Sequence, residues 1–240
     1  MTIIVIPCYN EAARIDADEF LRLSQAPGSS LLFVDDGSTD DTLQVLEALV
    51  ERAPDDMRVL ALDPNRGKAE AVRQGFLEAL AGDADCIAFI DADLATPVDE
   101  VLRLGELAAE SDADALIGSR IAHLGAAIDR SASRHLLGRA FATAASLALG
   151  APVYDTQCGA KFFRRSALLE EAVAEPFHSR WAFDVEFLGR LLAQDAKIVE
   201  VPLRRWVDVP GSKIGFKSMV KAGLDLVEIR SQLAKRRRRF

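Results

Sequence analysis

Cysteine and histidine are both scarce in this sequence, with three residues of each among 240. Cys8, Cys86 and Cys158 form an odd, widely spaced set without a CxxC pair. Such a set excludes a disulfide scaffold and a cysteine zinc cluster, and it indicates a reducing compartment. The histidines are scattered too, so a histidine-rich metal site is not expected.

Long apolar runs are also absent, because no stretch approaches the roughly 18 residues of a membrane-spanning helix. The first residues, MTIIVIPCYNE, have no basic segment and soon turn polar, so no signal peptide is expected. Half of the residues are hydrophobic, which is enough for one large core. We therefore expect a cytoplasmic protein, with peripheral binding to the cytoplasmic face of a membrane as a further expectation.

The net charge of −8 is spread unevenly along the chain. Residues 1–202 hold 18 Lys/Arg and 34 Asp/Glu, whereas residues 203–240 hold 11 and 3. The acidic part argues against nucleic acid as a partner. The basic end suits an anionic surface, such as a bilayer or a phosphate.

Apolar runs alternate with helical patterns over the first half of the chain. Strands are predicted at 2–7, 30–36, 57–63, 85–93 and 114–120, and helices at 11–25, 40–52, 68–82 and 97–111. This alternation predicts an α/β fold with a parallel, doubly wound sheet. Ligands of such sheets bind beyond the carboxyl ends of the strands, where the chain places Pro7 to Glu11, Asp35 with Asp36, Asp91 with Asp93, and Ser119 with Arg120.

The alternation breaks after about residue 125. Further elements are predicted as a helix at 134–150, a short strand at 160–166, a helix at 182–195 and a strand at 197–206. Neither a linker nor a repeat interrupts them, so one continuous domain is expected to reach residue 215. Residues 216–240 are expected to form an amphipathic basic helix and tail.

The stretch VDDGSTDDT, residues 34–42, gathers four aspartates behind a predicted strand. Gly37 permits a tight turn, and helix capping explains Asp40 and Asp41 without any further function. Capping explains Asp36 poorly, because this residue lies before the turn. Its carboxylate could accept a hydrogen bond from a base N–H or from sugar hydroxyls.

Asp91 and Asp93 in FIDADLATP lie two residues apart at a strand end. Residues i and i+2 of an extended segment point to the same side, so both carboxylates could share one divalent cation. Mg²⁺ and Mn²⁺ prefer such oxygen ligands, often completed by phosphate oxygens. The alternative is a solvated acidic turn.

Lys68 in NRGKAEAVRQG follows a glycine at the start of a predicted helix. The segment is not a P-loop, because the upstream glycine and the hydroxyl residue are missing. Lys68 could still meet a phosphate or a base carbonyl, and a solvated lysine is the alternative.

The ordered motifs IPCYNEAARI, VDDGSTDDT, NRGKAEAVRQG, DADLATP, GSR, DTQCGAKFF, WAFDVEFL and EVPLRRWVDVPGSK resemble the inverting family 2 glycosyltransferases. The resemblance covers roughly residues 2–215. It is greatest to the dolichyl-phosphate or polyprenyl-phosphate β-glucosyltransferases, with the dolichyl-phosphate mannosyltransferases as more distant relatives. Many relatives read GKGGAV where this chain has GKAEAV, so Glu70 adds a negative charge near the expected diphosphate.

The resemblance implies a GT-A fold, with a mostly parallel sheet and helices on both faces, that binds a nucleotide-sugar. The implied donor-binding residues are Pro7, Tyr9, Glu11, Asp36, Lys68 and Asp91. Asp93, with Asp91, would hold Mg²⁺ or Mn²⁺ on the diphosphate, where the cation stabilises the leaving nucleotide.

The resemblance also implies an acceptor side. Arg120 and Arg134 match positions that face an acceptor phosphate, which the arginine fork can bind with two hydrogen bonds. Asp155 and Asp184, together with Asp93, are the implied catalytic carboxylates. Gln157 matches the acceptor-side motif of Asp155, and Trp181 matches a motif that borders the sugar and the acceptor. An ionised phosphate acceptor needs no strong general base, whereas a hydroxyl acceptor does. Glu186 could equally be structural.

The C-terminal segment has two interpretations. Phe216, Met219, Val220, Leu226, Val227 and Leu233 share one helical face, opposite mostly charged residues. This pattern suits a helix that lies on an anionic membrane, and it equally suits a helix docked on the domain or on the partner of a homodimer.

These observations predict transfer of a hexose from a nucleotide-sugar, UDP-glucose first and GDP-mannose second, to a polyprenyl phosphate. A soluble-acceptor transferase is one rival. A haloacid-dehalogenase-like phosphatase is another, because FIDADLA resembles its nucleophile motif, although Ala95 departs from that motif. A non-catalytic nucleotide-sugar-binding protein would not need Arg120, Asp155 and Asp184.

Overall fold

The computed structural model describes the backbone of residues 1–128, 132–208 and 216–236. Side chains are described for residues 1–128, 138–208 and 223–236.

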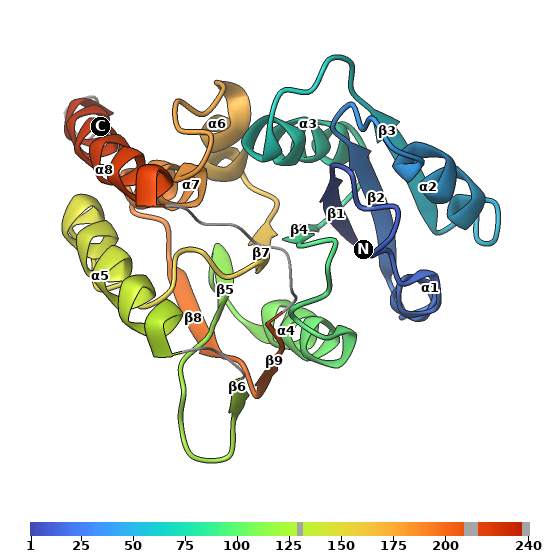
Figure 1. The fold of residues 1–240 in the computed structure, drawn as a ribbon, viewed down its shortest axis with the longest axis horizontal. Coiled ribbons are helices and arrows are strands. Elements are labelled where there is room, and N and C mark those ends of the chain that lie inside the picture. The colour runs from blue at the N-terminus through green and yellow to red at the C-terminus, as the bar shows by residue number, and fades with distance from the viewer. Residues whose placement is uncertain (129–131, 209–215, 237–240) are drawn as a thin grey trace.

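A seven-stranded sheet forms the centre of the fold, in the order β3-β2-β1-β4-β7-β5-β8 (Figure 1). Its strands are β1 (Thr2–Cys8), β2 (Ser29–Asp35), β3 (Met57–Ala61), β4 (Cys86–Ile90), β5 (Ala115–Ser119), β7 (Ala160–Arg164) and β8 (Ile198–Pro202). All neighbouring pairs run parallel except those of β7, which is antiparallel to both β4 and β5. The predicted mostly parallel α/β sheet is therefore confirmed.

Helices cover both faces of this sheet, because its β-branched strands alternate their side chains between the two faces. Ile3 and Val5 pack with side chains of α3 (Lys68–Ala81), α6 (Ala167–Ala174) and α7 (Phe183–Leu192). Ile4 and Ile6 face the opposite side, with α1 (Ala17–Ser24), α2 (Thr42–Val50) and α4 (Val98–Glu110).

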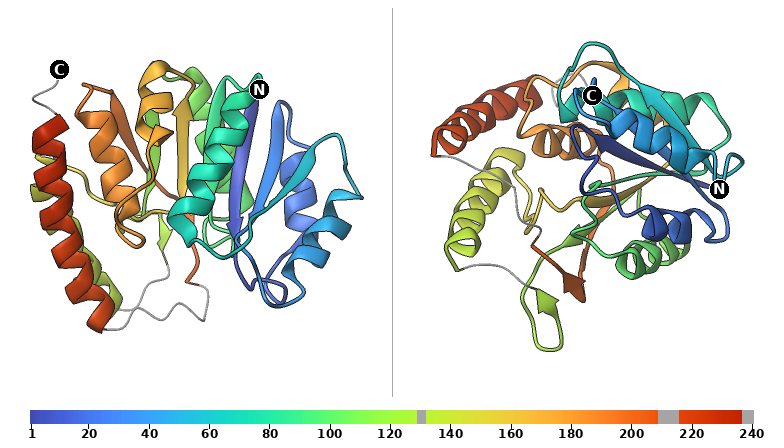
Figure 2. Two further views of the ribbon diagram at one scale, coloured as in Figure 1. Left: turned by 90° about the horizontal axis from the view of Figure 1, so that it is seen from above. Right: turned by 45° about the vertical axis from the view of Figure 1, so that its right-hand side comes forward.

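A third apolar cluster joins α7 to two further helices, α5 (Ala132–Leu149) and α8 (Phe216–Arg236). Figure 2 shows α5 and α8 side by side at one end of the molecule. Leu226, Ile229 and Leu233 of α8 are buried in this cluster, whereas Val227 is 70% exposed. The predicted apolar face is thus correct for Leu226 and Leu233 and wrong for Val227. Phe216, Met219 and Val220 lie outside the described side chains.

Two predicted elements differ from the structure, and one helix was not predicted. The helix predicted from residue 11 begins at Ala17, because the Asp16 carboxylate accepts from the Glu19 N–H and caps it there. The strand predicted at 197–206 is divided into β8 and β9 (Arg205–Trp206), and β9 pairs with β6 (Ala127–Ile128). Helix α6 was not predicted. Within the described residues, no helix combines the length and apolarity needed to cross a bilayer.

The division into a catalytic domain at 1–215 and a separate segment at 216–240 stays a prediction. Its C-terminal part does not stand apart from the domain, since α8 packs on α5 and α7.

Candidate functional site

The carboxyl ends of β1, β2, β4 and β5 meet at one edge of the sheet, because β1 pairs in parallel with β2 and β4, and both β4 and β5 run opposite to β7. The reversed direction of β7 brings the residues that precede it to this same edge. There the Asp91 N–H donates to the Gly159 carbonyl over 3.0 Å. A side chain at Gly159 would overlap the Asp91 carboxylate, so this close approach requires glycine. The predicted donor and acceptor motifs therefore lie at one edge.

Asp36 is buried, and its carboxylate organises the loop that leads into α3. Oδ2 accepts from Asn65 Nδ2 at 2.9 Å and from the Gly67 N–H at 2.7 Å, while Oδ1 accepts from the Arg66 N–H at 2.8 Å. These protein donors occupy both oxygens. Contact between Asp36 and a base stays a prediction, and the geometry instead gives the residue a loop-positioning role.

Asp35 is the aspartate of this stretch with a buried, uncommitted oxygen. It is 3% exposed, and its Oδ2 accepts from the Ser38 N–H at 3.2 Å. Its Oδ1 is buried and has no hydrogen-bond partner in the described part of the chain. A buried acceptor of this kind is costly unless a ligand satisfies it, which makes Asp35 a candidate for a base N–H. Sequence reasoning missed it, because position alone does not separate two adjacent aspartates.

The other two aspartates of the stretch lie at the start of α2. Asp40 Oδ1 accepts from the Thr42 N–H at 3.0 Å, which confirms a capping contact. Asp41 occupies the cap position, but its side chain makes no capping bond. Thr42 Oγ1 in turn accepts from the Glu11 N–H at 2.8 Å, so the start of α2 also fixes the loop after β1.

Replacing Asp36 by asparagine should lower the free energy of unfolding by roughly 1–3 kcal/mol, since an amide NH₂ would face N–H donors. Urea unfolding monitored by circular dichroism would measure this change. Asp41→Asn is the matched control and should change stability by less than about 0.5 kcal/mol. Equal losses in both variants would contradict the role assigned to Asp36.

Glu11, Asp91 and Asp93 form an acidic cluster with one lysine. Lys68 Nζ lies 2.5 Å from Asp91 Oδ1. Burial would raise the pKa of Asp91, but the Lys68 ammonium more than offsets this and keeps that pKa below its usual value. Burial raises the pKa of Asp93, and the charge of Asp91 raises it further. Burial likewise raises the pKa of Glu11, although Arg14 Nη2 lies 2.5 Å from Glu11 Oε1.

This cluster fits a divalent cation that also takes ligands from a substrate. In the part of the chain that is described, no group of three or more His, Cys, Asp or Glu residues is arranged to hold a metal by itself. Among the described residues Asp93 makes one hydrogen bond, from the Ala95 N–H to Oδ1 at 3.1 Å, which leaves its other oxygen available to a cation. Mg²⁺ bound by one or two carboxylates plus phosphates is a common arrangement. The role of Asp91 as a second ligand of the cation stays a prediction, because Lys68 Nζ already contacts its Oδ1.

Pro7 and Tyr9 stay predictions as donor contacts. Pro7 pairs with Val34 within the parallel ladder of β1 and β2. Tyr9 follows β1 at the ligand edge and is 46% exposed. A ring at that edge is available to a bound nucleoside.

Arg120 and Asp155 form a two-point ion pair on the predicted acceptor side. Arg120 Nε and Nη2 donate to Asp155 Oδ2 and Oδ1 at 2.7 and 2.8 Å, and the Arg120 N–H adds a bond of 3.0 Å. The Arg120 guanidinium also lies 5.4 Å from the centre of the Trp206 ring. Glu200 of β8 accepts from the N–H groups of Tyr154 and Asp155, which fixes the loop before β7.

This pairing makes Asp155 a weak base. Burial would raise the pKa of Asp155, but Arg120 outweighs burial and lowers that pKa from 3.8 to about 2. The catalytic role predicted for Asp155 stays a prediction, and the geometry favours positioning of Arg120.

The contribution of the Arg120–Asp155 ion pair to stability should be lost at acidic pH. Because the folded-state pKa of Asp155 is depressed, its stabilisation is present above pH 3.8 and is lost as the pH falls towards 2. The shift corresponds to about 2 kcal/mol of unfolding free energy. Urea unfolding from about pH 5 to about pH 2 should show a shallower decline for Asp155→Asn than for the parent. Identical slopes would contradict the depressed pKa.

Asp184 is held by a lysine that the sequence reasoning overlooked. Lys161 of β7 is 1% exposed, and its Nζ lies 2.7 Å from Asp184 Oδ1 and 4.7 Å from the centre of the Phe89 ring. Gln157 Nε2 donates to Asp184 Oδ2 at 3.2 Å. A lysine within the apolar run AKFF was the available signal. Asp184 as a catalytic base stays a prediction.

Glu186 and Trp181 have structural contacts. Glu186 accepts from the N–H groups of His178 and Ser179 and from Arg190 Nη2, which supports its structural alternative. Trp181 packs edge-on against Phe141 of α5 at 5.1 Å between ring centres. Arg134 falls in the first turns of α5, outside the described side chains.

Comparison with known proteins places these motifs in a family. The family described as "Glycosyl transferase family 2" matches residues 3–170. The dolichyl-phosphate beta-glucosyltransferase of Saccharomyces cerevisiae is 34% identical, over 95% of this chain and 73% of its own length. That of Homo sapiens is 34% identical over 95% of this chain and 74% of its own.

Solved structures share the fold at lower identity. Glucosyl-3-phosphoglycerate synthase from Mycobacterium tuberculosis, in complex with UDP, aligns with a TM-score of 0.69 at 21% identity, over 96% of this chain and 80% of that one. A mannosyltransferase from Pyrobaculum calidifontis, in complex with GDP-Man and Mn²⁺, aligns with a TM-score of 0.65 at 19% identity, over 98% and 64%. The two structures support the predicted GT-A fold.

Proposed function

Since the chain belongs to glycosyl transferase family 2, we propose that it transfers glucose from UDP-glucose to dolichyl phosphate or another polyprenyl phosphate, with inversion. The names of the similar yeast and human proteins support the acceptor and the sugar. Family membership argues against a phosphatase, and the acceptor-side ion pairs argue against a protein that only binds nucleotide-sugars.

The observation that carries this proposal is the state of the two candidate bases. Asp155 is paired with Arg120 and has a pKa of about 2, and Asp184 is paired with buried Lys161. Neither carboxylate is placed to remove a proton from a hydroxyl acceptor. A phosphate monoester is already ionised near neutral pH, so it needs no such base.

Under this proposal each residue of the site has a separate role. Asp35 would accept from the base through its uncommitted oxygen, and Glu11 would border the ribose. Asp93 would hold Mg²⁺ or Mn²⁺, whose chemical contribution is to stabilise charge on the departing diphosphate. Arg120 donates hydrogen bonds from Nε and Nη2 to Asp155. Its Nη1 would then donate to an oxygen of the acceptor phosphate. That oxygen bonds to the anomeric carbon as the bond to UDP breaks, and UDP keeps the bonding electrons.

A lipid acceptor also requires access to a bilayer, and we propose that α8 supplies it. Leu224 and Val227 of α8 are 68% and 70% exposed on the side away from its buried face, and Lys235 adds positive charge near its end. Apolar and basic side chains together favour anionic membrane surfaces. A homodimer through this face is the alternative use of the same residues.

The test is a transfer assay with the full chain, Mn²⁺ and dolichyl phosphate in anionic vesicles. UDP-glucose should give a glucosyl phospholipid, and the anomeric proton in the NMR spectrum should identify the β linkage. GDP-mannose as donor tests the second candidate. Efficient transfer to a soluble hydroxyl acceptor, with none to dolichyl phosphate, would overturn the proposal.

A further inference from the structure

Arg180 lies beside the donor half of the site, and the sequence motifs gave it no role. It belongs to the loop between α6 and α7, and its side chain covers Gly67. A Cβ at Gly67 would lie 3.8 Å from Arg180 Cδ and 3.9 Å from Arg180 Nε. Gly67 directly precedes Lys68, whose ammonium contacts Asp91. We propose that Arg180 binds the diphosphate of the nucleotide-sugar donor, an inference that rests on the proposed function.

The charges around Arg180 support this assignment. Three other cations of this edge have counterions: Arg14 contacts Glu11, Lys68 contacts Asp91, and Arg120 contacts Asp155. The exposed side chain of Arg66, next to Gly67, has no ion pair among the described residues and is a second cation open to an anion. Arg180 is exposed, and its guanidinium has no hydrogen-bond or ion-pair partner among the described residues. An exposed guanidinium without a protein counterion, beside the residue that precedes Lys68, adds positive charge that favours a bound anion. A diphosphate supplies that charge, with oxygens that the arginine fork can bind pairwise.

The loop that carries Arg180 is anchored on both sides. Glu186 Oε2 of α7 accepts from the N–H groups of His178 and Ser179 at 2.9 and 3.3 Å. Ser179 Oγ contacts Asp225 Oδ2 of α8 at 2.5 Å and accepts from the Ala182 N–H at 2.8 Å. These bonds fix the backbone on either side of Arg180, so the side chain extends from a rigid base. Preorganised cations of this kind lower the cost of ligand binding.

Titration calorimetry with Mn²⁺ would test this contact with three probes: UDP, UMP and uridine. Arg180→Ala should weaken UDP binding by about tenfold or more, as expected for lost charge-assisted hydrogen bonds. UMP binding should weaken less, and uridine binding should stay unchanged. Arg180→Lys should recover part of the loss, because lysine restores the charge without the fork.

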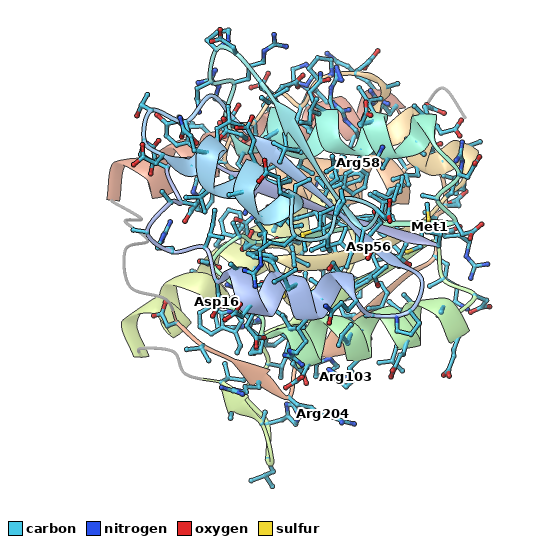
Figure 3. The ribbon with its side chains drawn as sticks, turned by 90° about the vertical axis from the view of Figure 1, so that its right-hand side faces the viewer. Met1, Asp16, Asp56, Arg58, Arg103 and Arg204 are labelled. Atoms are coloured by element: carbon cyan, nitrogen blue, oxygen red, sulfur yellow. The ribbon has the colours of Figure 1, made fainter. Side chains whose placement is uncertain are left out.

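Arg58→Ala is the matched control. Arg58 is an exposed arginine of β3 at the opposite end of the strands, and Figure 3 labels it near Met1 and Asp56, away from Asp16 at the ligand edge. It lines a hollow at the amino ends of the strands with Met1 and Asp56, where no predicted site residue lies. Its replacement should leave all three affinities unchanged.

The remaining outcomes separate this inference from the proposed function. If the parent binds UDP and Arg180→Ala binds it equally well, the inference is wrong and the function stands. Equal losses for UDP and uridine would assign Arg180 a structural role instead. An unchanged UDP affinity with a raised KM for dolichyl phosphate would assign it to the acceptor. A parent that binds neither UDP nor GDP would overturn both proposals.

Discussion

Replacing Asp93 by asparagine should lower the rate of the proposed glucosyl transfer by roughly two to three orders of magnitude, since it would remove the charged ligand proposed for the cation that stabilises the leaving group. The fold should survive, because burial and the charge of Asp91 already disfavour the ionised form of Asp93 and raise its pKa. Initial rates at saturating Mn²⁺, together with a thermal melt, would measure both effects.

Asp99→Asn provides the matched control for Asp93→Asn. Asp99 lies in the first turn of the following helix and forms a surface pair with Arg22, with its own side chain 72% exposed. Such a pair contributes little, so the control should keep the parent's rate. A full transfer rate with an unchanged response to Mn²⁺ in Asp93→Asn would rule out this metal site.

Replacing Lys161 by methionine should lower the free energy of unfolding by about 3–5 kcal/mol, because it leaves the Asp184 carboxylate buried without its counterion. The side chains of the pair are only 1% and 8% exposed, so water cannot take over the role of the lysine. Chemical denaturation of the parent and the variant would give the difference.

A double variant shows whether the uncompensated charge causes that loss. Lys161→Met combined with Asp184→Leu removes both charges and should recover most of the stability, since well-packed apolar replacements of buried pairs are often neutral. Additive losses would instead indicate that packing around β7 was disturbed. A single Lys161→Met variant as stable as the parent would contradict the buried pair itself.

Much of the fold could be predicted because its signals are local. Apolar runs and helical spacing identified β1 to β5 and α1 to α4, and parallel pairing then placed Asp91, Asp93 and Arg120 at one edge. The position of β7 between β4 and β5 could not be predicted in this way. That position depends on how a long connection returns to the sheet, and strand spacing carries no information about it.

The site was predictable in outline but not in its pairings. The end of a predicted strand identified Asp35 and Asp36 together. Donors from the loop at 65–67 bind the Asp36 carboxylate, which leaves Asp35 as the residue with an oxygen available to a ligand. Lys161 was overlooked because its partner Asp184 is distant in sequence. Such contacts follow from the tertiary fold, whereas motifs report only which residue types are present.

The placement of β7 also orders events during synthesis. β5 leaves the ribosome before β7, yet it joins the growing sheet only through β7 and β8, because it does not pair with β4. Until residue 164 is available, one edge of β4 therefore lacks its neighbour. Unpaired strand edges are templates for intermolecular association. A nascent chain or fragment that stops before β7 carries this exposed edge, and completion of β7 closes it at the same time as it brings together the residues of the predicted acceptor side.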